Sequence, residues 1–223
     1  GLLEFDGTYW NKYPLNNKST MANFCCNTIT IKGDQVTLRN IHHILKRESE
    51  DGLFERLIGK EPGMTQEQYK SDWYQSNIRY WGCKSDVEVD FHYELSDGEL
   101  MLCPDTPYSP PIEFCRVLAT SYNVDIHMFY YGIEDDFCGV TTLTKEGFIN
   151  EEDYDYLDGL YIFGEMDLFW SEVESQIESY IECNEEDGVN VEEFISEYVE
   201  AVSDVTKGEI RELFQEQLEL YKN

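Results

Sequence analysis

The stretch Phe24-Cys25-Cys26-Asn27-Thr28-Ile29-Thr30-Ile31-Lys32 is rich in β-branched residues, and from Thr28 onward polar and apolar side chains alternate. The turn residues Gly33-Asp34 follow. Alternation with a period of two that ends at a turn is typical of a half-buried strand. From residue 35 to residue 47 the apolar residues change to a spacing of three and four, which is typical of a helix. The sequence thus predicts a strand followed at once by a helix.

The same two patterns recur over the first two thirds of the chain. Ser96-Asp97-Gly98-Glu99 predicts a hairpin turn between two of the further strands. The order is strand, helix, strand, strand, helix, strand, with one extra strand. This order predicts an α+β fold, a ferredoxin-like sandwich in which helices cover one face of an antiparallel sheet. Helices are expected at residues 65–80 and from residue 112, and strands at residues 87–95, 100–103, 124–131 and 138–144.

The whole chain is strongly acidic. Its 223 residues include 46 Asp and Glu but only 16 Lys and Arg, which gives a formal net charge of −30. Binding to DNA or RNA depends on cationic side chains that neutralise phosphates, so direct nucleic-acid binding is not expected. An anionic membrane surface is an unfavourable partner for the same reason. The charge favours basic proteins as partners.

The sequence carries no sign of membrane insertion or secretion. No run of 18 apolar residues is present, and the first residues lack the basic and long apolar segments of a secretory signal. The seven cysteines are irregularly spaced and form no Cys-x-x-Cys pair, which favours reduced thiols. We therefore expect a protein of the cytoplasm.

The acidic residues are concentrated in the last third of the chain. Residues 151–223 contain 23 acidic and 3 basic residues, a net charge of −20, which leaves −10 for residues 1–150. This change of composition predicts a boundary near residue 150. The expected organisation is an N-terminal arm over residues 1–20, a ferredoxin-like domain over residues 21–150 and an acidic helical region over residues 151–223.

The acidic region carries apolar stripes at helical spacing, with carboxylates on other faces. Like charges four residues apart destabilise a helix by a few tenths of a kcal/mol per pair, so a face of one sign has a cost. Carboxylates four residues apart repeat every ~6 Å along the helix axis, an interval similar to that of phosphates along a DNA strand. The candidate partner-binding residues are Glu174, Glu178, Glu182, Glu185, Glu186, Asp187, Glu193, Glu197, Glu200 and Asp204.

Residues that could support catalysis or metal binding do not form a recognisable site. Lys84 beside Cys83 could lower the pKa of the thiol, but no local histidine could act as a base, so a packing role is favoured. If Gly188 is placed at the glycine position of a calcium-binding loop, Cys183 and Phe194 fall at two obligatory ligand positions. The sequence predicts neither an enzyme nor a bound metal or cofactor.

Three ordered motifs lie between residues 21 and 145. They are Met21-Ala22-Asn23-Phe24-Cys25-Cys26-Asn27, Trp81-Gly82-Cys83-Lys84 and Thr106-Pro107-Tyr108-Ser109-Pro110-Pro111. Together they resemble the YubB-like ferredoxin-fold proteins of phages and conjugative plasmids, which have Met-x-Asn-Trp-Cys-x-Asn, Trp-Gly-Thr-Lys-Trp and Thr-x-Trp-Ser-Pro-Pro. Phe24 and Tyr108 replace tryptophans, and Ser85 stands where the family has an aromatic residue. The resemblance implies a ferredoxin-like fold and a mobile-element setting but no settled activity, and the acidic last third lies outside it.

Two functional hypotheses follow from these observations. The first is a non-catalytic inhibitor from a phage or plasmid, which mimics a nucleic acid and occupies the basic groove of a host defence protein such as a CRISPR or restriction nuclease. The second is an accessory protein–protein interaction module of a mobile element, which uses the ferredoxin-like sheet or the Tyr108 loop. In the second hypothesis the acidity serves only solubility.

Overall fold

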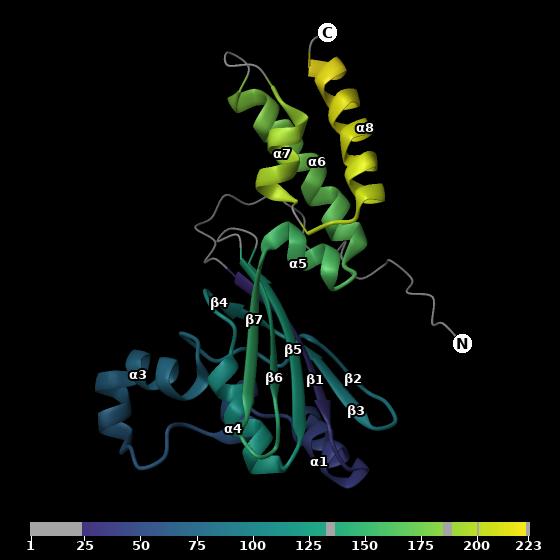
Figure 1. The fold of residues 1–223 in the computed structure, drawn as a ribbon. Coiled ribbons are helices and arrows are strands. Elements are labelled where there is room, and N and C mark those ends of the chain that lie inside the picture. Colours follow the sequence, from purple (N-terminus) through teal and green to yellow (C-terminus); the bar gives the residue numbers. More distant parts are fainter. Residues whose placement is uncertain (1–23, 133–136, 185–188, 200, 222–223) are drawn as a thin grey trace.

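The computed structural model describes residues 24–132, 137–184, 189–199 and 201–221 (Figure 1). The N-terminal arm expected over residues 1–20 lies outside these ranges. So do four of the candidate partner-binding residues, Glu185, Glu186, Asp187 and Glu200.

The described chain forms an α+β fold around one antiparallel sheet. Strands β1 (Phe24–Lys32), β2 (His92–Leu95), β3 (Glu99–Cys103) and β5 (Asp125–Gly132) lie in the order β2-β3-β1-β5. Helix α1 (Gln35–Lys46) lies in the connection from β1 to β2, and α4 (Ile112–Tyr122) lies in the connection from the β2–β3 hairpin to β5. The predicted α+β sandwich is therefore confirmed, because the element order and the antiparallel pairings are those of the ferredoxin-like arrangement.

The sheet is larger than the sequence predicts. The predicted extra strand is β6 (Phe137–Leu143), which pairs with β5. Two strands were not predicted: β7 (Ile149–Asp155) pairs with β6, and the short β4 (Asp105–Pro107) pairs with the start of β1. Strand β7 crosses residue 150, where the charge distribution placed the boundary. The chain is therefore still part of the sheet at Asp155, and the helices of the acidic region begin at Tyr156.

A first hydrophobic core lies between one face of the sheet and the helices α1, α2 (Leu53–Ile58), α3 (Gln66–Trp81) and α4. Strand β1 explains how this face is chosen, because its residues alternate between buried and partly exposed positions. Residues from six elements make up its centre: Ile29, Ile31, Leu38, Phe54, Leu100, Phe114 and Met128 are all fully buried.

The strand predicted over residues 87–95 forms only at His92–Leu95. The preceding residues hold helix α2 instead. The Asp86 carboxylate accepts hydrogen bonds from the backbone N–H of Phe54 at 2.7 Å and of Glu55 at 2.9 Å, and the Val87 carbonyl accepts one from Leu53. The alternation that begins at Val87 was misleading there, because the Val87 carbonyl is used by a helix end that lies more than thirty residues earlier in the chain.

The acidic region forms α5 (Tyr156–Ile162), α6 (Met166–Cys183), α7 (Val191–Tyr198) and α8 (Asp204–Tyr221). Their apolar stripes make a second core with the opposite face of the sheet, to which β5 contributes Phe129 and Tyr131 and β6 contributes Cys138 and Val140. Helix α5 lies against the sheet, and α6, α7 and α8 stand beyond its end (Figure 1). No helix among the described residues has the length and apolar character that crossing a membrane requires.

Candidate partner-binding sites

Three of the predicted carboxylates form one row along α6. Glu174, Glu178 and Glu182 are exposed, and a spacing of four residues puts them on the same side of the helix. This side faces α8, because the Gln217 side-chain amide donates a hydrogen bond to Glu174 Oε1 at 3.0 Å. We call these three residues the α6 acidic row.

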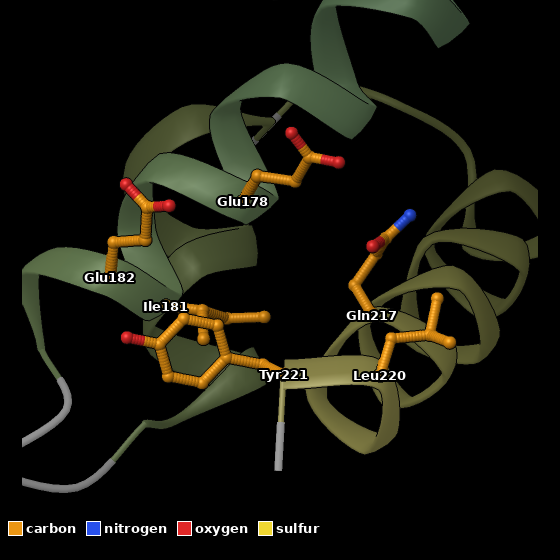
Figure 2. Close-up of a pocket in the computed structure, with 6 residues that line it drawn as sticks. All are labelled: Glu178, Ile181, Glu182, Gln217, Leu220 and Tyr221. Atoms are coloured by element: carbon orange, nitrogen blue, oxygen red, sulfur yellow. The ribbon is translucent and has the colours of Figure 1, made fainter. Parts of the chain in front are cut away.

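A groove lies between α8 and the last two residues of the α6 acidic row. Glu178 and Glu182 line one side of it, Gln217 and Leu220 line the other, and Ile181 lies at its base (Figure 2). The groove has a volume of about 310 Å³. Carboxylates on one wall and an amide with an apolar side chain on the other suit a cationic group on an apolar stem, which is the chemistry of a lysine or arginine side chain.

Two other predicted carboxylates lie on a different side of the helices. Glu193 and Glu197 on α7 are exposed and approach Tyr180 of α6. Burial raises the pKa of the Tyr180 hydroxyl, and the negative charges of these two residues raise it further. Tyr180 follows Glu174 by six residues, which places it about 120° around the helix axis. The structure therefore divides the predicted surface into the α6 acidic row and a separate α7 pair. Asp204 lies at the start of α8, and its charge helps to raise the pKa of Arg211 on the same helix.

Neither set of carboxylates is neutralised within the described parts of the chain. In those parts, no Lys or Arg nitrogen lies within 4.0 Å of the α6 acidic row or the α7 pair. Arg211 on α8 instead binds Glu192 through two hydrogen bonds of 2.6 and 2.9 Å, and this contact lowers the pKa of Glu192. Sequence reasoning did not single out Glu192, because the helix spacing alone does not show which carboxylate meets the rare base.

The ferredoxin-like part contains a second candidate site, built on the loop between β4 and α4. The three motifs found in the sequence meet at this loop. The Asn27 amide donates hydrogen bonds to the Pro104 carbonyl and to Thr106 Oγ1, at 2.9 and 3.0 Å. Thr106 donates to the Ser109 carbonyl at 2.7 Å, and Ser109 donates to the Gly82 carbonyl at 2.9 Å. Asn27 and Thr106 are buried, so the loop is fixed from beneath.

This fixed loop holds Tyr108 in an unusual conformation. Its φ of +68° lies in the left-handed region, which bulky residues rarely adopt. The side chain is 47% exposed, and the Lys84 ammonium lies 5.4 Å from the centre of its ring. Backbone strain of this kind is found where the surrounding structure determines the position of a functional side chain. Tyr108 is therefore presented to solvent by a rigid support.

The other side of this site comes from the ends of the last strands. A cleft of about 730 Å³ lies between Tyr108 and these strands. The Tyr130 hydroxyl donates a hydrogen bond to Asp153 Oδ1 at 3.0 Å, and the rings of Tyr130 and Phe137 are 6.2 Å apart. Burial and this hydrogen bond raise the pKa of Tyr130. We call the site the Tyr108 cleft; it is lined by Tyr108, Pro110, Tyr130, Phe137, Cys138, Asp153, Tyr154 and Asp155.

The Cys83-Lys84 pair is not arranged as a reactive thiol. Cys83 is fully buried, and burial together with the charge of Asp86 raises its pKa to about 12. Lys84 turns toward the Tyr108 ring instead. These facts agree with the packing role that the sequence favoured for Cys83.

Comparison with known proteins gives one structural likeness. No protein-family model matches the chain, and no curated protein matches it. Among solved structures, the chain is similar to the crystal structure of a protein api92 from Yersinia pseudotuberculosis, of the family DUF1281. The likeness has a TM-score of 0.42 and 9% sequence identity, and it covers 60% of this chain and 98% of that chain.

Proposed function

We propose that the protein is a non-catalytic acidic inhibitor, which presents carboxylates of its C-terminal helices to the basic nucleic-acid groove of a host defence protein. The observation that supports this proposal most strongly is the α6 acidic row. Its three carboxylates repeat at ~6 Å along a rigid helix, similar to phosphates along a strand, and no described Lys or Arg neutralises them.

The physical basis is competition for cationic side chains. A nuclease that binds DNA or a guide-bearing strand does so largely through Lys and Arg contacts to phosphates. Carboxylates on a helix can pair with the same side chains, and the net charge of −30 would speed the encounter by long-range attraction. CRISPR and restriction nucleases of the host are the target class that we propose, and a phage or plasmid is the proposed source of the protein.

A competition experiment tests the proposal directly. The chain is titrated into complexes of candidate CRISPR and restriction nucleases with fluorescent duplex DNA, and displacement is followed by anisotropy. The variant Glu174→Gln/Glu178→Gln/Glu182→Gln should displace the DNA at least tenfold less effectively. The matched control is Glu48→Gln/Glu50→Gln/Glu67→Gln, which removes three exposed carboxylates from the ferredoxin-like part. Equal displacement by both variants would mean that only net charge matters, and the mimic would be rejected.

A second candidate function is an accessory interaction module, which the Tyr108 cleft favours. Deleting residues 151–223 does not separate the two functions, because that cut falls within β7 and uncovers the sheet residues Phe129 and Tyr131. Substitution inside each site is the better test. The interaction module predicts that partner capture survives neutralisation of the α6 acidic row but is lost when Tyr108 is replaced.

A further inference from the structure

We propose that the Tyr108 cleft binds the guanidinium group of an arginine in a segment of another protein. This inference does not depend on the proposed inhibitor function, because the cleft and the α6 acidic row share no residue. Three features of the cleft lead to it: an aromatic lining, carboxylates at its edge, and a cation that already lies against one of its rings.

The aromatic lining is made possible by two glycines of the sheet. Gly139 is the direct partner of Tyr130 across β5 and β6, and a Cβ atom at Gly139 would overlap the Tyr130 ring. Gly132 is the direct partner of Phe137, and a Cβ atom there would overlap the Phe137 ring. Each ring therefore lies across the neighbouring strand. The two rings together form one wall of the cleft, and Tyr108 with Pro110 forms the other.

The carboxylates stand at the end of β7. Asp153 and Asp155 are exposed and two residues apart on the strand, so they lie on the same face of the sheet as Tyr130 and Phe137. Across the described ranges, neither carboxylate has a Lys or Arg nitrogen within 4.0 Å. The Tyr130 hydroxyl donates a hydrogen bond to one of the two carboxylate oxygens of Asp153. The cleft therefore combines aromatic faces with unneutralised negative charge.

Lys84 already makes a contact of this kind with one ring of the cleft. Its ammonium lies 5.4 Å from the centre of the Tyr108 ring, which is within the range of a cation–π contact. A second cation can enter between Tyr108 and the partly exposed ring of Phe137, whereas the Tyr130 ring beside them is buried. A planar guanidinium fits such a site better than an ammonium, because it stacks on aromatic rings and donates two parallel hydrogen bonds to a carboxylate.

The strain at Tyr108 is the reason to assign a ligand rather than a packing role. Glycine would occupy φ = +68° at lower energetic cost, yet the position carries a large side chain that is 47% exposed. Exposed aromatic residues on a rigid support are typical anchors for a partner. The open cleft and the two carboxylates specify that partner as an arginine-bearing segment.

The probe is a blocked peptide Gly-Arg-Gly-Arg-Gly, titrated into the full chain at 150 mM NaCl and followed by NMR of the tyrosine ring signals. We expect saturable binding with shifts at Tyr108 and Tyr130. The same peptide with citrulline, which keeps the shape but lacks the charge, should not saturate. Tyr108→Gly should weaken binding at least threefold, the lower range for a lost cation–π contact. Asp153→Asn/Asp155→Asn should weaken it about tenfold.

Matched variants keep the test decisive. Phe148→Ala removes another exposed aromatic side chain, and Glu48→Gln/Glu50→Gln removes two exposed charges elsewhere; both should bind like the unmodified chain. Tyr108→Gly should fold well, since glycine relaxes the backbone, and Tyr108→Asn is a second variant suited to a positive φ. Neutralising the α6 acidic row should leave peptide binding unchanged. Equal binding by Tyr108→Gly, Tyr108→Asn and Phe148→Ala, or equal binding of the citrulline peptide, would overturn the inference.

Discussion

The ring of Tyr130 on β5 fills the space above Gly139, its direct partner on β6. This placement lets the Tyr130 hydroxyl pass across β6 and reach Asp153 on β7. Three neighbouring strands are thus connected on one face by a single side chain, and the glycine is required because any larger residue would overlap the ring.

Gly139→Ala should therefore destabilise the protein. Forcing a methyl group into an occupied site costs about 1–3 kcal/mol, and the melting temperature measured by calorimetry should fall by several degrees. The matched control is Gly208→Ala in α8, where nothing lies within 4 Å of the added Cβ atom. That change should stabilise the protein by about 0.5–1 kcal/mol, because alanine is the better helix former. If both variants shift the melting temperature in the same direction, the close contact at Gly139 is not the cause.

The Asp86 carboxylate holds the start of α2, so its removal should loosen that helix. Asp86→Ala leaves the backbone N–H groups of Phe54 and Glu55 without their partner, and the loss of such a cap costs about 0.5–2 kcal/mol. Denaturation by urea measures the change. Asp90→Ala, at an exposed residue on the same segment, serves as the control and should have almost no effect. A similar loss for both variants would indicate that charge rather than the cap is responsible.

Neutralising two members of the α6 acidic row should stabilise the protein at low ionic strength. Glu178 and Glu182 are four residues apart, and like charges at this spacing repel each other by a few tenths of a kcal/mol. Glu178→Gln/Glu182→Gln should raise the melting temperature in 20 mM NaCl, and the gain should shrink in 500 mM NaCl because salt screens the repulsion. A gain that is the same at both salt concentrations would argue against repulsion as its source.

The effect of Glu165→Gln should depend on pH. Glu165 precedes α6, and burial raises the pKa of its carboxyl group, with a smaller contribution from the charge of Asp167. The charged form is thus penalised in the folded state. This penalty is absent below the unfolded-state pKa of about 4.3 and is complete once the pH exceeds the raised folded-state value, so the stability contributed by Glu165 falls as the pH rises.

Glu165→Gln should therefore melt a few degrees higher than the unmodified protein at pH 7, since ~1 kcal/mol corresponds to roughly 2–4 °C in a chain of this size. The difference should almost disappear at pH 3.5. Glu216→Gln, on the exposed side of α8, controls for the loss of one charge. If the difference in melting temperature grew toward pH 3.5, the charged form of Glu165 would not be the penalised one, contrary to the raised pKa.

Much of the fold follows from local patterns. The alternation along β1, β5 and β6 and the helical spacing along α1 predict these elements close to their observed bounds, and the pattern from residue 112 predicts the start of α4. The apolar stripes predict helices in the acidic region without fixing where they begin and end. Strand β7 could not be found in this way, because Glu151, Glu152 and Asp153 are exposed on an edge strand and give no apolar alternation. Its position depends on pairing with β6, which is not encoded in its own side chains.

The sequence by itself determined the α+β class, the order of the core strands and the concentration of negative charge in the last third, because each depends on residue type and spacing along the chain. Only the tertiary structure decided which carboxylates share a surface and which lie apart, since that depends on how α6, α7 and α8 pack. It also decided that Asn27, Gly82 and Ser109 jointly support Tyr108. Hydrogen bonds between residues so distant in the chain form only after the sheet has brought their strands together.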